Sequence, residues 1–493
     1  MGAIVMRRNF GNRIRAGSSL ALTLALAACG VPNLGDRPQI RPPAQLESAR
    51  SLASTQGGMT TAWPQENWWE AYGDPTLNAL VAEGLANSPS VAAAAARVRQ
   101  ATGATQVAGA DGLPQINGEG QAGWTKQSYN NGFPREFLPQ GWKQTGQLAL
   151  TGDFDLDLWG RRRKQLAAAT SEEYAVRTDA DQARLLLASN IVSSYFDLAR
   201  LLERDASLST AVASRESLGG LIRRRSEQGL ENQTPVRQTA AETSRARVSL
   251  SANREQIAAR RHALAALLGA GPDRGLDIKP AVLGTIQETA LSPDAGIALA
   301  GRRPDIVAAR LRAEAAGKRL DIAKTAYLPD ISLRGLIGLT SLGFSNLFKS
   351  GSDYGTGAAA FSLPIFDGGR LRGQYRQSRG AFDLAVADYN ETVVTALREV
   401  ADALASREAA KTQEQDARQA RRDADAAFSL ASQRYNAGLS TYIDVLSAQQ
   451  VALEAREAAI DAHFRTLATE IALKRALGGG FAENSNEKVS SND

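Results

Sequence analysis

The chain has 493 residues, a formal net charge of +5 and an apolar fraction of 43%, with only 6% aromatic residues. One cysteine excludes an intrachain disulfide, and two histidines leave almost no side chains for a metal or redox centre. No motif pairs a nucleophile with a base or builds a phosphate loop, so we expect neither an enzyme nor a bound cofactor. Basic runs at 161–164 and 223–225 are interpreted as solvated helix surface and not as a nucleic-acid site, because no aromatic residues lie among them.

Residues 1–28 have the pattern of a secretory signal peptide. A basic start precedes an apolar run from Leu20 to Ala28, which is too short to span a bilayer. The run ends in Leu-Ala-Ala-Cys29, which resembles the lipobox of bacterial lipoproteins. This resemblance implies a covalent lipid on Cys29, and Gly30 in place of aspartate implies the outer membrane. An incidental cysteine after a signal peptide is the alternative.

Residues 29–61 are rich in proline, serine and glutamine, which predicts an extended segment that leads away from the lipid anchor. The first structured part, 62–270, begins with two helices, opened by Asp74-Pro75 and by Pro89. The hydrophobic period then changes to two, which predicts strands at 116–126 and 147–158.

A proline-free stretch from Gly160 to Gln228 predicts a helix about 100 Å long. We expect Gly229 to reverse the chain and a second helix to return from Pro235 to Leu268. Alanine supplies much of the apolar content, which suits long helices that pack closely.

The second structured part, 290–480, repeats the first. Three landmarks keep one offset of 209 residues: Gly160-Arg161 with Gly369-Arg370, Gly229-Leu230 with Gly438-Leu439, and Leu268-Gly269 with Leu477-Gly478. The repeat predicts strands at 331–342 and 354–366 and long helices at 369–436 and 442–477. A tail rich in glycine, asparagine and serine, 481–493, is predicted to be disordered.

The four predicted strands are two-faced. Leu148, Leu150 and Phe154 alternate with Thr151 and the acidic Asp153 and Asp155, as in a membrane barrel with lipid outside and water inside. Four strands cannot close a barrel, and open strand edges are not tolerated in lipid. We therefore expect several copies of the chain to pool their strands.

The order of motifs along the chain resembles the TolC superfamily, and more closely its lipid-anchored NodT/OprM branch. The residues that carry the resemblance are Trp68-Trp69, Gly73-Asp74-Pro75, Asn87-Ser88-Pro89, Leu113-Pro114, Leu363-Pro364, Phe366-Asp367-Gly368-Gly369 and the run from Arg434 to Leu446. The family implies a mixed α and β membrane protein. In it, a homotrimer forms a 12-stranded outer-membrane β-barrel, four strands per chain, continuous with a periplasmic α-helical barrel.

The resemblance also implies the function. Members are outer-membrane channels of tripartite resistance–nodulation–division (RND) efflux systems, in which a periplasmic adaptor joins the channel to an inner-membrane transporter. We expect passive conduction of drugs or other small molecules. A type I secretion exit duct would use the same tube, whereas a periplasmic coiled-coil adaptor or scaffold lipoprotein would not explain the duplicated strands.

Family positions for the periplasmic gate fall on Tyr435 and Asp444. Ser440, Ser447 and Pro235 depart from the charged residues that some members carry there, which favours a single ring of Asp444 side chains over an ion-pair network. The alternative for Asp444 is a charge that complements its helix dipole. The adaptor is expected to contact the two turns, at Gly229-Leu230 and Gly438-Leu439.

Overall fold

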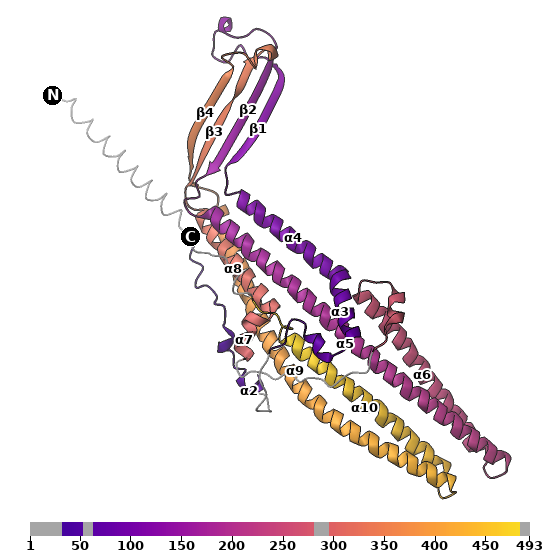
Figure 1. Cartoon of the computed structure of the whole chain (residues 1–493). Coiled ribbons are helices and arrows are strands. Elements are labelled where there is room, and N and C mark those ends of the chain that lie inside the picture. The colour runs from indigo at the N-terminus through magenta and orange to yellow at the C-terminus, as the bar shows by residue number, and fades with distance from the viewer. Residues whose placement is uncertain (1–31, 53–62, 281–294, 484–493) are drawn as a thin grey trace. The chain divides into compact units, whose positions relative to one another are not determined.

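The computed structural model describes residues 32–52, 63–280 and 295–483; the predicted signal peptide and Cys29 lie outside them. The chain divides into two compact units. Figure 1 labels the helices and strands of both. Within the described residues, the first comprises 32–39, 99–175 and 310–388. The second comprises the remaining described residues, including most of the long helices.

Helices account for most of the described chain. In order they are α2 (Ala49–Leu52), α3 (Pro75–Asn87), α4 (Pro89–Ala110), α5 (Arg161–Glu227), α6 (Gln233–Leu267), α7 (Ala295–Arg302), α8 (Pro304–Thr325), α9 (Arg370–Asn436) and α10 (Tyr442–Ala476). Short 3-10 helices are η1 (Pro43–Gln45), η2 (Trp68–Tyr72), η3 (Arg135–Phe137), η4 (Pro272–Asp277) and η5 (Phe344–Asn346). The predicted long helices are confirmed: α5 and α9 each have 67 residues, and α6 and α10 each have 35.

The first unit contains one antiparallel sheet in the order β1-β2-β3-β4. Its strands are β1 (Gln115–Thr125), β2 (Lys143–Asp155), β3 (Asp330–Leu342) and β4 (Asp353–Ser362). Hairpins join β1 to β2 and β3 to β4, and the central β2–β3 pair joins the two copies of the repeat.

The strand ends differ from the prediction. β2 starts at Lys143 because it pairs with β1 as far as Thr125, and it ends three residues before 158. The reason for the early end is Asp157, whose positive φ of 45° turns the chain and whose carboxylate accepts the N–H groups of Arg162 and Arg163. β4 ends at Ser362 and not at 366, because Pro364 has no N–H to donate to the ladder.

Two segments predicted to be irregular contain defined structure among their described residues. The segment predicted to be extended contains η1 and α2, because its apolar residues pack: Leu52 is buried in a cluster with Leu299 and Leu477. At the other end, Glu483 donates its N–H to Gly301 O at 3.0 Å, so 481–483 belong to the described structure. Residues 484–493 of the predicted tail lie outside it.

The main core lies in the second unit, where α3, η2, α5 and α10 meet. Asp74 caps α3 by accepting the N–H groups of Thr76 and Leu77, and its second carboxylate oxygen accepts the buried hydroxyl of Tyr195. An 18-residue window of α5 is long and apolar enough to cross a bilayer by composition, but half of it is buried inside the protein. Apolar residues of α5 such as Ile191 and Leu198 belong to this core.

Candidate functional site

The register of the sheet sorts the side chains onto two faces, because directly opposed residues in a sheet share a face. One face is apolar or glycine-rich along all four strands. It carries Ile116 and Trp124 of β1, Leu148, Leu150 and Phe154 of β2, Ile331, Leu333, Ile337 and Leu339 of β3, and Ala359 and Phe361 of β4. The predicted alternation is therefore confirmed for the residues that lie within the strands.

The described residues leave much of the apolar face uncovered. Ile116 is 75% exposed, Ile337 67% and Phe361 66%. Exposed aromatic residues also flank the strands, with Phe137 and Trp142 between β1 and β2, and Trp159 and Phe366 just after β2 and β4. An apolar band flanked by aromatic residues at both ends is the pattern of a strand surface that faces lipid.

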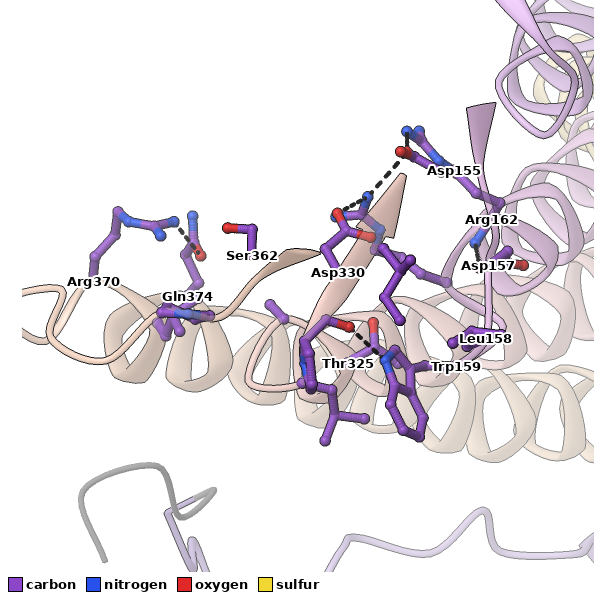
Figure 2. Close-up of a pocket in the computed structure, with 17 residues that line it drawn as sticks. Asp155, Asp157, Leu158, Trp159, Arg162, Thr325, Asp330, Ser362, Arg370 and Gln374 are labelled. Carbon is purple, nitrogen blue, oxygen red and sulfur yellow. Dashed lines mark hydrogen bonds and ion pairs between the residues drawn. The ribbon is translucent and has the colours of Figure 1, made fainter. Parts of the chain in front are cut away.

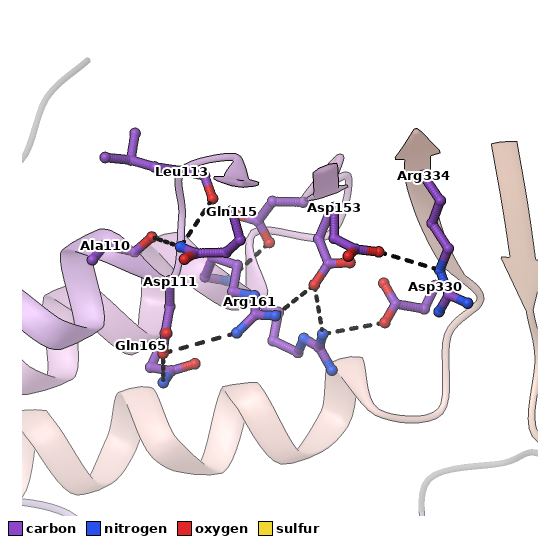
Figure 3. A network of polar contacts seen from close by, with 12 residues as sticks. Ala110, Asp111, Leu113, Gln115, Asp153, Arg161, Gln165, Asp330 and Arg334 are labelled. Atoms are coloured by element: carbon purple, nitrogen blue, oxygen red, sulfur yellow. Dashed lines mark hydrogen bonds and ion pairs between the residues drawn. The ribbon is translucent and has the colours of Figure 1, made fainter. Parts of the chain in front are cut away.

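The opposite face carries the polar and charged side chains of β1 and β2, together with Leu336 and Leu342 of β3. Gln115, Glu119, Gln147 and Asp153 lie on it, and the carboxylate of Asp153 pairs with Arg334 of β3 at 3.5 Å (Figure 3). Such a face suits contact with water, so the sheet separates an apolar environment from an aqueous one.

Where the strands meet the helices, a charged network joins β2, β3 and the start of α5. Arg161 lies 3.2 Å from Asp330 and 3.6 Å from Asp155, and Arg162 also pairs with Asp155 (Figures 2 and 3). The indole N–H of Trp159 donates to Pro329 O at 2.6 Å. The first two arginines of the basic run at 161–164 thus fix helix α5 to the sheet.

This network lines a pocket of about 360 Å³ (Figure 2). Asp157 is held ionised here: burial opposes its charge, but the N–H groups of Arg162 and Arg163 outweigh that effect and lower its pKa. Among the described residues, no group of three or more metal-ligating side chains is present.

At the far ends of the long helices lie the two predicted turns. Gly229 and Gly438 have φ values of 75° and 74°, and each ends its helix in a Schellman motif. Leu230 donates its N–H to Arg225 O, and Leu439 donates to Arg434 O, both at 2.8 Å. The side chains of Leu230 and Leu439 are 65% and 69% exposed, so both turns present an apolar residue at their surface.

Helices α5 and α6 form one helical hairpin, and α9 and α10 form the other. Tyr435 lies at the contact between these two helical hairpins. Only 2% of it is exposed, its ring covers the guanidinium of Arg225 at 4.9 Å, and its hydroxyl donates to Glu231 at 3.4 Å. Burial raises its pKa, so the hydroxyl stays protonated as a donor. Tyr442, in the same buried cluster as Tyr435, accepts the Thr239 hydroxyl at 2.8 Å. The sequence pointed to Tyr435 but not to these partners in the first copy.

Asp444 lies at the start of α10, with its side chain exposed. It forms a capping box with Thr441: its carboxylate accepts the N–H of Thr441 at 2.9 Å, and its own N–H donates to the Thr441 hydroxyl. The Thr441 N–H and hydroxyl lower its pKa. Locally, Asp444 is therefore a charged residue at the start of a helix, which was the alternative interpretation. A ring of three Asp444 side chains at the gate stays a prediction.

Pro235, Ser440 and Ser447 stand where some family members carry charged residues. Pro235 lies in the first turn of α6, which is capped without a carboxylate, by Asn232 accepting the Thr234 N–H at 2.8 Å. Ser440 is half-buried and Ser447 exposed, so neither supplies a charge to the ends of the hairpins.

The comparison with known proteins decides between the functions that the sequence left open. Residues 80–270 and 298–479 match the model of the outer membrane efflux protein family, and together they cover more than half of the chain. The chain belongs to this family. It is therefore an outer-membrane component of an efflux system, and the family is one of transport proteins.

Relatives and solved structures agree with this assignment. This efflux protein is 30% identical over 492 residues to the toluene efflux pump outer membrane protein TtgF of Pseudomonas putida, covering 96% of this chain and 98% of TtgF. It is 32% identical to the fusaric acid resistance protein FusA of Burkholderia cepacia, over 72% of this chain and 67% of FusA. The outer membrane protein VceC of Vibrio cholerae has a similar structure, with a TM-score of 0.81, 37% identity, and coverage of 85% of this chain and 100% of VceC. The Campylobacter jejuni CmeC channel shares the fold at 24% identity, with a TM-score of 0.83, over 92% of this chain and 95% of CmeC.

Proposed function

We propose that three copies of this efflux protein pool their sheets into a 12-stranded barrel that conducts small molecules passively across the outer membrane. The observation that carries the proposal is the sheet itself. Most of its large apolar side chains share one exposed face, and among the described residues β1 and β4 are each paired along one edge only. Strands of 10 to 13 residues are long enough to cross the hydrocarbon core when tilted.

The open edges require a partner. An unpaired row of N–H and C=O groups is costly in lipid, so β4 of one copy is expected to pair with β1 of the next. The polar face, with Glu119, Gln147 and Asp153, then lines the water-filled lumen. The protein adds no chemistry, and the direction of transport comes from the pump that feeds it.

The partners follow from the same proposal. A periplasmic adaptor and an inner-membrane RND transporter deliver the substrate, and the adaptor contacts the hairpin ends at Gly229-Leu230 and Gly438-Leu439. Covalent lipid on Cys29 holds the N-terminus in the outer membrane. The names of TtgF and FusA support small organic compounds as the substrate class.

The experiment is to purify the full-length protein from outer membranes and measure its subunit number and its conductance in planar bilayers. We expect a trimer that dissociates on heating and forms ohmic pores. A water-soluble monomer without conductance would contradict the proposal. Cys29→Ala should abolish labelling with radioactive palmitate, and retained labelling would rule out this residue as the anchor.

A further inference from the structure

The two hairpin ends are copies of one sequence, yet they differ in charge. Residues 220–240, at the end of the α5–α6 hairpin, contain four arginines and two glutamates, a net charge of +2. The matching residues 429–449, at the end of the α9–α10 hairpin, contain one arginine and one aspartate, a net charge of zero. Both ends lie in the second unit (Figure 1).

The difference lies in exposed side chains. Arg223 and Arg224 are exposed, and at the offset of 209 residues their counterparts are the neutral Ser432 and Gln433. On the return helix, the exposed Arg237 is replaced by Leu446.

The second end is apolar where the first is polar. Ile443 is 64% exposed and stands where the first copy has Thr234. Leu430 is also 60% exposed, whereas its counterpart Leu221 is half-buried in the cluster around Ile222.

Contacts between the helical hairpins occupy one acid and one arginine of the first end. Glu231, one of its two acids, accepts the hydroxyl of Tyr435. Arg225 is covered by the ring of the same tyrosine at 4.9 Å, so its guanidinium belongs to the contact between the hairpins. The charges that a partner meets first are therefore the exposed Arg223, Arg224 and Arg237, with Glu227 as the exposed acid.

We propose that the two ends dock different surfaces of the periplasmic adaptor: the first end binds acidic side chains at the turn of a helical hairpin, and the second binds an apolar surface. This inference rests on the proposed function. Charge complementarity at the edge of an interface acts mainly on the association rate and its salt dependence, and it suppresses partners of the wrong charge. The arginines thus specify which adaptor the channel accepts.

The test uses the purified full-length channel and two synthetic helical hairpins, clasped by a disulfide, that differ only in three turn residues: glutamates in one and lysines in the other. Fluorescence anisotropy measures the binding of each hairpin at low and high salt. We expect the glutamate hairpin to bind on the order of tenfold more tightly than the lysine hairpin, with the difference shrinking as salt screens the charges.

The duplicated sequence supplies a matched control. Arg223→Glu with Arg224→Glu should reverse the preference, whereas Ser432→Glu with Gln433→Glu, at the equivalent positions, should leave the preference for glutamate at the first end unchanged. Equal binding of both hairpins to the wild-type channel overturns the inference, as does a preference that survives the arginine reversal. So does an arginine reversal that spares hairpin binding but abolishes sedimentation with purified peptidoglycan, because the arginines would then serve an anionic polymer.

Conductance in planar bilayers separates the two proposals. If the arginine variant conducts like the wild type and the hairpins show no charge preference, the docking inference fails and the channel function stands. If the wild-type protein does not conduct, the proposed function itself fails.

Discussion

The ring of Tyr435 covers the guanidinium of Arg225 at 4.9 Å, and these residues belong to different copies of the repeat. Each lies in the last turns of a long helix, just before the glycine that reverses the chain. The contact therefore ties the end of one hairpin to the end of the other within a single chain.

We predict that Tyr435→Ala loosens the ends of the hairpins and raises single-channel conductance severalfold, because it removes both the cation–π contact and the donor to Glu231. An exposed cation–π contact contributes about 0.5–1 kcal/mol and more when desolvated, so one substitution is enough to shift a closed–open balance. Planar-bilayer recordings provide the measurement.

Tyr435→Phe is the control for this change, since it keeps the ring over Arg225 and removes only the hydroxyl. It should give a smaller effect than Tyr435→Ala. Identical conductance of the wild type and the alanine variant would show that Tyr435 does not contribute to closure.

Asp444 is predicted to make the pore prefer cations, because three copies would place three carboxylates at one constriction. Asp444→Asn should reduce the cation-to-anion permeability ratio, measured from the reversal potential in a salt gradient. Asn keeps a side-chain oxygen for the cap, so helix α10 should persist. An unchanged ratio in this variant would place Asp444 away from the constriction.

The pH dependence of this preference follows from the lowered pKa of Asp444. A carboxyl group with a depressed folded-state pKa stays ionised above its ordinary value and is neutralised only when the pH falls through the depressed pKa. The cation preference should thus be constant from neutral to mildly acidic pH and decline only when the pH falls into the range in which aspartate titrates. A decline already near pH 6 would point to a different group.

Adjacent residues of β2 allow the orientation of the sheet to be tested. Leu150 lies on the apolar face and is 52% exposed, whereas Thr151 lies on the polar face. Leu150→Arg should destabilise the membrane-inserted protein by about 2–4 kcal/mol, the cost of a cation near the bilayer midplane on a lipid-facing strand. The amount of heat-dissociable trimer in outer membranes is the measurement.

Thr151→Arg, one residue away, should leave trimer yield near that of the wild type, since its side chain would reach water. If the two substitutions had equal effects, or if Thr151→Arg were the more damaging, the assignment of faces would be reversed or wrong.

Glycines that follow the two helices of one helical hairpin are predicted to differ in tolerance. A Cβ on Gly438 meets no atom within 4 Å, so Gly438→Ala should cost about 1–2 kcal/mol of local strain from its positive φ alone. A Cβ on Gly478 would lie 1.9 Å from the backbone O of Arg302, so Gly478→Ala should prevent folding or sharply lower the melting temperature.

The first copy supplies the matched pair. A Cβ on Gly229 meets no atom within 4 Å, while one on Gly269 would lie 2.5 Å from Asn87 O. Thermal unfolding followed by circular dichroism should give Gly229→Ala and Gly438→Ala melting temperatures close to that of the wild type. Gly269→Ala and Gly478→Ala should melt far below it. Equal melting temperatures for Gly438→Ala and Gly478→Ala would contradict the packing at Arg302.

The sequence by itself determined the parts of this protein whose signals are local. Proline-free stretches set the long helices, glycines that favour positive φ set the turns, and alternation with period two set the two faces of the strands. The duplication was visible because Gly229 and Gly438 keep their spacing to other landmarks. Strand ends were less certain, since they depend on which residues pair across the sheet, and the turn at Asp157 gave no periodic signal.

Only the tertiary structure decided which residues of the two copies meet. Arg161 pairs with both Asp155 and Asp330 because β2 and β3 lie side by side at the centre of the sheet, and Tyr435 contacts Arg225 and Glu231 because the ends of the helical hairpins pack together. The partners of Tyr435 lie more than 200 positions away in the chain. Helical and strand periods specify the face on which a side chain lies, but the packing of one element against another specifies what that face touches.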